Sequence, residues 1–148
     1  MRHIDAAPTD EFGWVPQDFT PPHGFVHLPG PGKFIGRSAD YFIRRQDDGN
    51  HSLGTLICEG QSNTQGFAHG GFLMTFADFA MTIITMGITI NLTADFIRPV
   101  KVGEWIEAQV VTRKRTANLI FADAMATTNG REVLRMSGVF KPVPNRAP

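Results

Sequence analysis

Two hydrophobic periodicities follow one another along this chain. Between Gly70 and about Met86, large apolar side chains recur at helical spacing: Phe72, Phe76, Phe79 and Ile83. The spacing i, i+4, i+7 and i+11 predicts one long helix with a single apolar stripe. We expect Gly87 to end this helix, because glycine readily adopts the left-handed conformation found after helix C-termini.

From Ile88 onward the period changes to two, and apolar residues alternate with polar ones as far as Phe96. Further strands are predicted over 41–45, 52–59, 105–112, 119–127 and 132–141. The pair Asn129-Gly130 is typical of a tight hairpin turn. One long helix among hairpin-linked strands predicts an α+β fold, in which the helix covers one face of an antiparallel sheet.

The first 36 residues have a different character, because prolines alternate there with aromatic residues. Proline withholds the backbone donors that helices and sheets need, whereas the aromatic rings supply apolar area to bury. We therefore divide the chain into an N-terminal arm (1–36), packed on the domain, and the domain itself (37–148). A short helical turn is expected near Thr9–Trp14.

Composition narrows the possible partners and location. Lys plus Arg and Asp plus Glu both number 14, so no overall field recruits nucleic acid or an anionic membrane. The single Cys58 excludes an internal disulfide and a cysteine-built zinc site. No secretory signal is recognisable, because the N-terminal segment has no continuous apolar core after Arg2. No membrane span is recognisable either, because the apolar stretch 72–90 contains Asp78 and several threonines. We expect a cytoplasmic protein with neither membrane insertion nor a nucleic-acid partner.

Asp78 is the only charged side chain of the predicted helix. An ionised carboxylate is costly to bury without partners, so such positions are neutralised, solvated or functional. Two interpretations remain open from the helix alone. Asp78 either faces solvent on a threonine-rich face or takes part in chemistry.

The entrance of the same helix carries His69-Gly70-Gly71. Two glycines leave backbone N–H groups unobstructed at the positive end of the helix dipole, where an anion or developing oxyanion is stabilised. The alternative is a tight turn with a capping or packed histidine. Combined with Asp78, and with Asn63 as an amide donor, this helix start would suit ester or thioester hydrolysis.

These residues together form a recognisable pattern. The string Asn63-x-x-Gly66-x-x-His69-Gly70-Gly71, followed after six residues by Asp78, resembles the active-site signature of hotdog-fold acyl-CoA thioesterases. The resemblance is to the PaaI-like branch of the 4-hydroxybenzoyl-CoA thioesterase superfamily. It extends from about Tyr41 to Lys141, and includes a strand and turn over 88–104.

The resemblance implies a hotdog fold, a long helix wrapped by a curved antiparallel sheet. It also implies a homodimer whose sheets join edge to edge, often paired again into a homotetramer. Each active site would then combine Asn63, His69 and Gly70 of one subunit with Asp78 of the other. Thioesters are already activated, so no metal and no cofactor are expected.

The same resemblance implies a role for each matched position. Asp78 would be the nucleophile or general base, and the Gly70 N–H the main oxyanion donor, with Gly71 as a second. Asn63 would orient the carbonyl or the water, and His69 would position the thioester or the loop. Thr89 falls where some members place a hydroxyl that holds the attacking water.

Two departures from the family pattern concern substrate binding. The connection between the helix and Ile88 is very short, although in many relatives a longer loop helps to shape the acyl pocket. The basic turn after the strand 105–112 matches only loosely, and its charges either bind the phosphates of coenzyme A or are simply solvated. The candidate phosphate-binding residues are Arg98, Lys114, Arg115 and Asn118.

The sequence therefore predicts an acyl-CoA thioesterase acting on a medium-chain or aromatic acyl-CoA. One alternative is a hotdog protein that binds acyl-CoA without hydrolysing it, although binding alone needs no carboxylate facing a thioester. Another is a hotdog hydratase or dehydratase, whose acid–base pair has a different spacing. Measured thiol release and enoyl-CoA hydration separate these three activities.

Overall fold

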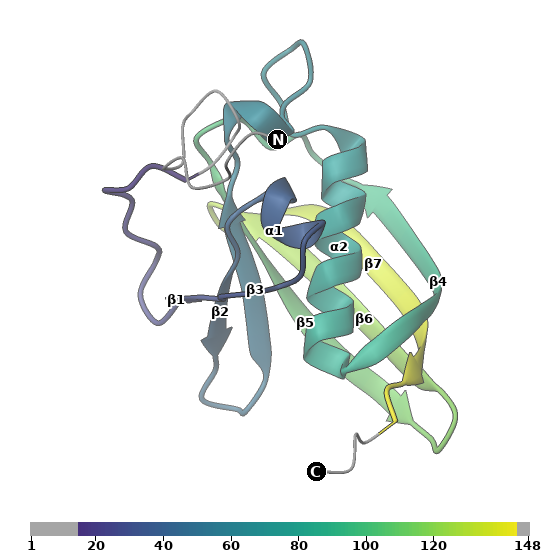
Figure 1. The fold of residues 1–148 in the computed structure, drawn as a ribbon. Helices are drawn as coiled ribbons and strands as arrows, with labels where there is room; N and C mark the ends of the chain where they lie inside the picture. Colours follow the sequence, from purple (N-terminus) through teal and green to yellow (C-terminus); the bar gives the residue numbers. More distant parts are fainter. Residues whose placement is uncertain (1–14, 145–148) are drawn as a thin grey trace.

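The computed structural model describes residues 15–144, in which one long helix lies on a curved antiparallel sheet (Figure 1). The elements in chain order are β1 (Val26–His27), α1 (Ile35–Ser38), β2 (Phe42–Arg45), β3 (His51–Leu56), a 3-10 helix (Glu59–Gln61), α2 (Gly70–Thr85), β4 (Gly87–Phe96), β5 (Trp105–Arg115), β6 (Ile120–Thr128) and β7 (Arg131–Pro142). Within these residues the strand order is β1-β2-β3-β5-β6-β7-β4. The predicted α+β fold is confirmed.

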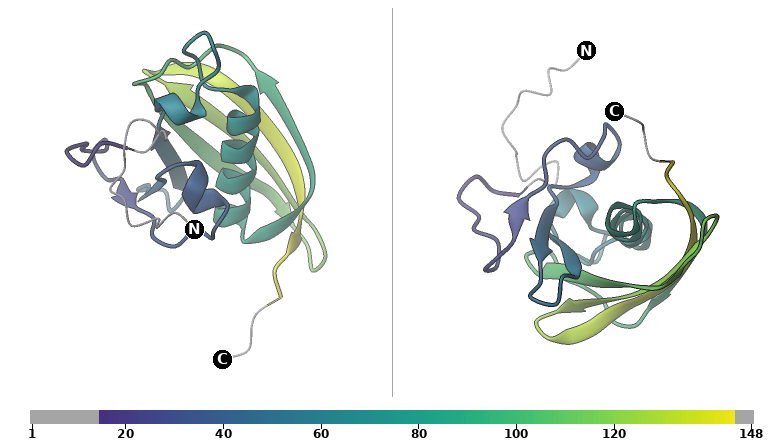
Figure 2. Two further views of the ribbon diagram at one scale, coloured as in Figure 1. Left: turned by 45° about the horizontal axis from the view of Figure 1, so that its top comes forward. Right: turned by 90° about the horizontal axis from the view of Figure 1, so that it is seen from below.

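The core lies between α2 and the concave face of the sheet, which wraps around the helix (Figure 2). Phe76, Ala77, Ala80 and Met81 of α2 are all 0% exposed. They pack against buried sheet residues that include Ile106, Ala108, Leu134 and Met136. Burying each large apolar side chain contributes about 1.5–3 kcal/mol. No helix within residues 15–144 is long and apolar enough to cross a bilayer.

The end of α2 differs from the prediction. Met86, not Gly87, adopts the left-handed conformation, with φ 56°, and its N–H bonds to the Thr82 carbonyl. Gly87 is already the first residue of β4. A Cβ at position 87 would lie 2.6 Å from Cβ of Phe140, so the glycine is required by close packing. A single residue thus joins the helix to the following strand.

In the described part of the chain, strand β4 forms one edge of the sheet and pairs with β7 alone. Its register shifts between Thr89 and Asn91, so Ile90 forms a bulge and the alternation changes phase there. Ile88 and Ile90 remain 55% and 58% exposed. The predicted strand is therefore correct, but no residue in the described range 15–144 covers these two apolar side chains.

The first described part of the arm, residues 15–25, packs around Trp105 in a cluster separate from the core under α2. Phe19 stacks on Trp105 with ring centroids 5.8 Å apart, and Phe25 meets the same indole edge-to-face at 5.0 Å. Val15 and Phe25 are buried in this cluster. The expected packing of the arm is thus seen from Val15 onward. The helical turn expected near Thr9–Trp14 lies outside the described residues.

Gly54 makes room for the indole at the centre of this cluster. A Cβ at position 54 would lie 2.2 Å from Cζ2 of Trp105. We expect Gly54→Ala to destabilise the protein by about 1–3 kcal/mol through overpacking, measured by urea denaturation. In the double variant with Trp105→Leu the alanine should cost much less. Equal costs with and without Trp105 would contradict the close-packing explanation.

Candidate active site

The start of α2 is built around His69. This residue is the N-cap, with extended backbone, and its Nδ1 accepts the N–H of Gly71 at 2.8 Å. A Cβ at Gly71 would lie 3.0 Å from that same nitrogen. His69 therefore occupies the Gly71 N–H. In contrast, the N–H of Gly70 has no acceptor within residues 15–144, which leaves it as the donor available to a ligand.

Asn63 lies in a loop that is tied to the helix start. Its Oδ1 accepts the N–H groups of Gln65 at 2.9 Å and Phe67 at 3.2 Å, so the side-chain oxygen is used by the loop itself. The loop is closed by the bond from the His69 N–H to the Gln61 carbonyl, 2.7 Å long. Only the amide NH₂ of Asn63 can therefore serve a ligand, as a donor suited to a carbonyl oxygen.

Asp78 lies where α2 and β4 meet. Its side chain is neither fully buried nor fully exposed, and its Oδ1 accepts a hydrogen bond from the Thr89 hydroxyl. The second carboxylate oxygen has no hydrogen-bond donor within the described chain. Thr89 thus orients the carboxylate and leaves one oxygen available to react.

The two halves of the candidate site are far apart within one protomer. Asp78 follows Gly70 by eight residues in the same helix, which corresponds to about 12 Å along the axis at the usual helical rise. That distance is too great for both groups to act on one carbonyl, since reacting groups must approach to about 3–3.5 Å. Within one protomer, Gly70 and Asp78 therefore cannot act on the same carbonyl group.

The basic residues singled out from the sequence occupy two different places. Arg98 follows β4 and donates to the Glu132 carbonyl at 2.7 Å. Arg115 donates to the Thr85 carbonyl at the C-terminus of α2, where a cation is favourable. Its neighbours Lys114 and Asn118 belong to the same hairpin region. These three residues lie at the opposite end of α2 from Gly70.

A hollow of about 390 Å³ lies beside the helix start. Its lining includes Arg37 and Ser38 of α1, Gln61, Ser62, His69 and Thr75. Sequence reasoning missed Arg37, because nothing in the sequence indicates that the short helix α1 lies beside the start of α2. Among residues 15–144, no group of three or more His, Cys, Asp or Glu side chains is placed to hold a metal ion.

Comparisons with known proteins identify the family of this chain. Residues 65–134 match the family described as the thioesterase superfamily. A Pseudomonas aeruginosa protein whose name describes it as an esterase is 30% identical over 127 residues, which cover 80% of this chain and 95% of that protein.

Solved structures show the same fold. Zebrafish thioesterase superfamily member 2 is 20% identical, with a TM-score of 0.67 over 78% of this chain and 89% of that one. A Streptococcus pneumoniae hypothetical thioesterase solved with coenzyme A is 19% identical, with a TM-score of 0.63 over 70% and 88%. The Escherichia coli PaaI protein is 21% identical, with a TM-score of 0.64 over 70% and 79%. The fold is the expected hotdog fold, and the chain belongs to the thioesterase superfamily.

Proposed function

We propose that the protein is an acyl-CoA thioesterase that hydrolyses a medium-chain or aromatic acyl-CoA to the free acid and coenzyme A. The main support for this proposal is the hydrogen bond from the Thr89 hydroxyl on β4 to the Asp78 carboxylate on α2. It accompanies an open Gly70 N–H at the helix start. One group supplies the attack and the other stabilises the oxygen on which charge develops.

In the proposed reaction the thioester oxygen accepts hydrogen bonds from the Gly70 N–H and the Asn63 amide. Asp78 of a second copy faces the carbonyl carbon with the oxygen that Thr89 leaves available. This oxygen either removes a proton from an attacking water or attacks the carbon itself, forming an anhydride that water then hydrolyses. In both routes the carbon–sulfur bond breaks, and the coenzyme A thiolate leaves and is protonated.

The homodimer that this mechanism requires is proposed to form through β4. An edge strand presents unpaired N–H and C=O groups that can pair with another chain. β4 spans Gly87–Phe96 with two exposed isoleucines, whereas the opposite edge, β1, spans only Val26–His27. Antiparallel pairing of two β4 strands would join the two sheets edge to edge. A second pairing into a homotetramer remains an expectation from the family resemblance.

The proposed activity is tested with purified protein and a panel of acyl-CoAs from acetyl to palmitoyl, with phenylacetyl and benzoyl included. A thiol-reactive dye measures the coenzyme A released. Release that is fastest with medium-chain or aromatic groups supports the proposal. Tight binding of acyl-CoA without thiol release would instead indicate a binding protein, and hydration of an enoyl-CoA would indicate a hydratase.

Asn63→Ala should be milder than loss of the carboxylate, because the Gly70 N–H remains to hold the carbonyl oxygen. We expect kcat to fall by roughly 10-fold, less than a general base contributes, as measured by steady-state thiol release. Because Asn63 Oδ1 also holds its own loop, Asn63→Asp is a matched control that keeps this acceptor and removes the NH₂. If Asn63→Ala lowered kcat as much as Asp78→Asn does, the Asn63 amide would contribute as much to turnover as the Asp78 carboxylate, contrary to the proposal.

A further inference from the structure

The part of the arm next to the candidate site has an unusual surface composition. Phe34 is 71% exposed, more than any other large apolar side chain found exposed within residues 15–144. Exposed cations lie on both sides of it in sequence, at Lys33 and Arg37. A single exposed apolar side chain is common on protein surfaces. The combination with two exposed cations is more informative, because a ring can stack on a base while the cations pair with phosphates.

Neither cation is used by the rest of the described chain. The side chains of Lys33 and Arg37 have no hydrogen-bond or ion-pair partner within residues 15–144, although the Arg37 backbone N–H donates to the Phe34 carbonyl. Most other arginine side chains in this range have a partner. Four of them pair with a carboxylate, namely Arg44, Arg113, Arg131 and Arg135. Two donate to a backbone carbonyl, namely Arg98 and Arg115. The two arm cations are thus available to an anion from outside the protein.

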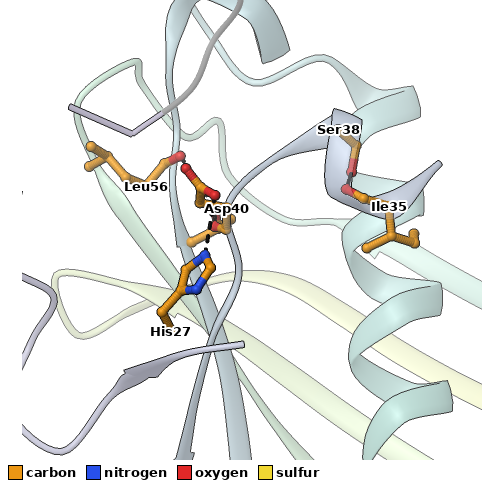
Figure 3. A network of polar contacts seen from close by, with 6 residues as sticks. His27, Ile35, Ser38, Asp40 and Leu56 are labelled. Atoms are coloured by element: carbon orange, nitrogen blue, oxygen red, sulfur yellow. Dashed lines mark hydrogen bonds and ion pairs between the residues drawn. The ribbon is translucent and has the colours of Figure 1, made fainter. Parts of the chain in front are cut away.

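The segment that carries them is held in a fixed place. The Ser38 hydroxyl donates to the Ile35 carbonyl at 2.7 Å, as Figure 3 shows. The Asp40 carboxylate lies 3.3 Å from Nε2 of His27. The Tyr41 hydroxyl also forms a hydrogen bond with the Ser38 hydroxyl, with the two oxygens 2.8 Å apart. Burial raises the pKa of the Tyr41 phenol to about 12. These contacts hold the C-terminal end of α1 and the residues that follow it.

Gln61 connects this segment directly to the helix start. Its side-chain nitrogen donates to the Ser38 carbonyl at 2.8 Å, and its side-chain oxygen accepts the Cys58 N–H at 2.7 Å. Its own carbonyl accepts the His69 N–H at 2.7 Å. One residue, only 4% exposed, thus sets the position of α1 relative to His69. The hollow of about 390 Å³ lies between them, with Arg37 on its lining.

We propose that Lys33, Phe34 and Arg37 form the subsite for the nucleotide end of the acyl-CoA substrate, an inference that rests on the proposed function. The hollow would hold the linker between thioester and phosphates, at a size within the usual range for ligand sites. Arg37 and Lys33 would pair with the phosphates, and the Phe34 ring would stack on the adenine. The protomer that supplies Gly70 would then also supply the nucleotide contacts.

This placement agrees with the proposed dimer. Figures 1 and 2 show α1 on one flank of α2 and β4 on the other. Pairing through β4 would therefore leave the surface of Lys33, Phe34 and Arg37 open. The hairpin that carries Lys114 and Arg115 lies at the far end of α2 within the same protomer, so it is not part of this subsite.

The test compares two thioesters of one acyl group, the acyl-CoA and the N-acetylcysteamine thioester, which lacks the nucleotide. We expect Arg37→Ala, Lys33→Ala and Phe34→Ala each to raise KM for the acyl-CoA about tenfold, the usual scale for a charge-assisted or stacking contact. The kcat should change little, and KM for the short thioester much less. Arg45→Ala, an exposed arginine on β2, is the matched control and should leave both substrates unaffected.

Calorimetry with 3′,5′-ADP separates this inference from the proposed function, because it needs no turnover. If the wild type binds 3′,5′-ADP and the triple variant does not, the subsite is supported, even if neither thioester is hydrolysed. Absence of hydrolysis would refute only the thioesterase proposal. Equal effects of the arm variants on both thioesters would overturn the subsite. Undiminished binding of 3′,5′-ADP by the triple variant would also overturn it.

Discussion

Asp78→Asn is expected to lower kcat for the preferred acyl-CoA at least ~100-fold, the lower end of what a general base contributes. The amide has the shape of the carboxylate, and its oxygen can still accept the Thr89 hydroxyl. It can neither accept a proton from water nor attack a thioester. Folding and assembly should therefore persist, as checked by thermal denaturation and by light scattering after size exclusion.

Asp95→Asn provides the matched control for this variant. Asp95 is a carboxylate on β4 itself, but it is exposed and pairs with Arg135 of β7 at 2.8 Å. Its loss should change turnover by less than twofold, since exposed ion pairs contribute little. If a folded Asp78→Asn protein kept wild-type turnover, the carboxylate would have no part in the reaction.

The second large effect is expected at the open edge of the sheet. Replacing Ile88 and Ile90 together by Asp should produce a monomer, because like charges would face each other across two paired β4 strands. Turnover should fall at least ~100-fold, since each site then loses the base supplied by the second copy. The protomer should stay folded, because both side chains are more than half exposed.

Light scattering and thiol release on the same preparation measure the two consequences together. Val26→Asp is the matched control, because Val26 is 62% exposed on β1 at the other edge. It should leave both mass and turnover unchanged. A folded monomer of the Ile88/Ile90 variant with full activity would show that one protomer holds a complete site.

The regular elements were predictable because they depend on local periodicity. The stripe of α2 and the alternation of β4 appear directly in the order of residues, and both elements are present. The bulge at Ile90 was not predictable, because it depends on the register against β7. The end of α2 was assigned to Gly87, whereas the need for glycine there comes from Phe140, 53 residues further along the chain.

The candidate site likewise contains residues that the sequence could predict and contacts that it could not. Asn63, His69, Gly70 and Asp78 could be selected because their spacing matches a family signature. The occupation of the Gly71 N–H by His69 depends on a side-chain rotamer, which no sequence pattern specifies. The proximity of Arg37 to the helix start depends on how the arm folds back and on the buried amide of Gln61. Contacts of this kind join distant parts of the chain and leave no periodic signal.

The one-residue joint at Met86 has a consequence for the order of assembly. A long loop would let β4 shift along α2, but this joint fixes the first residues of the strand against the last turn of the helix. The threonine and the carboxylate it orients are therefore brought together by chain connectivity within an isolated protomer. In the proposed dimer, folding of each protomer would therefore complete the Asp78–Thr89 pair before association brings Gly70 of the second copy to it.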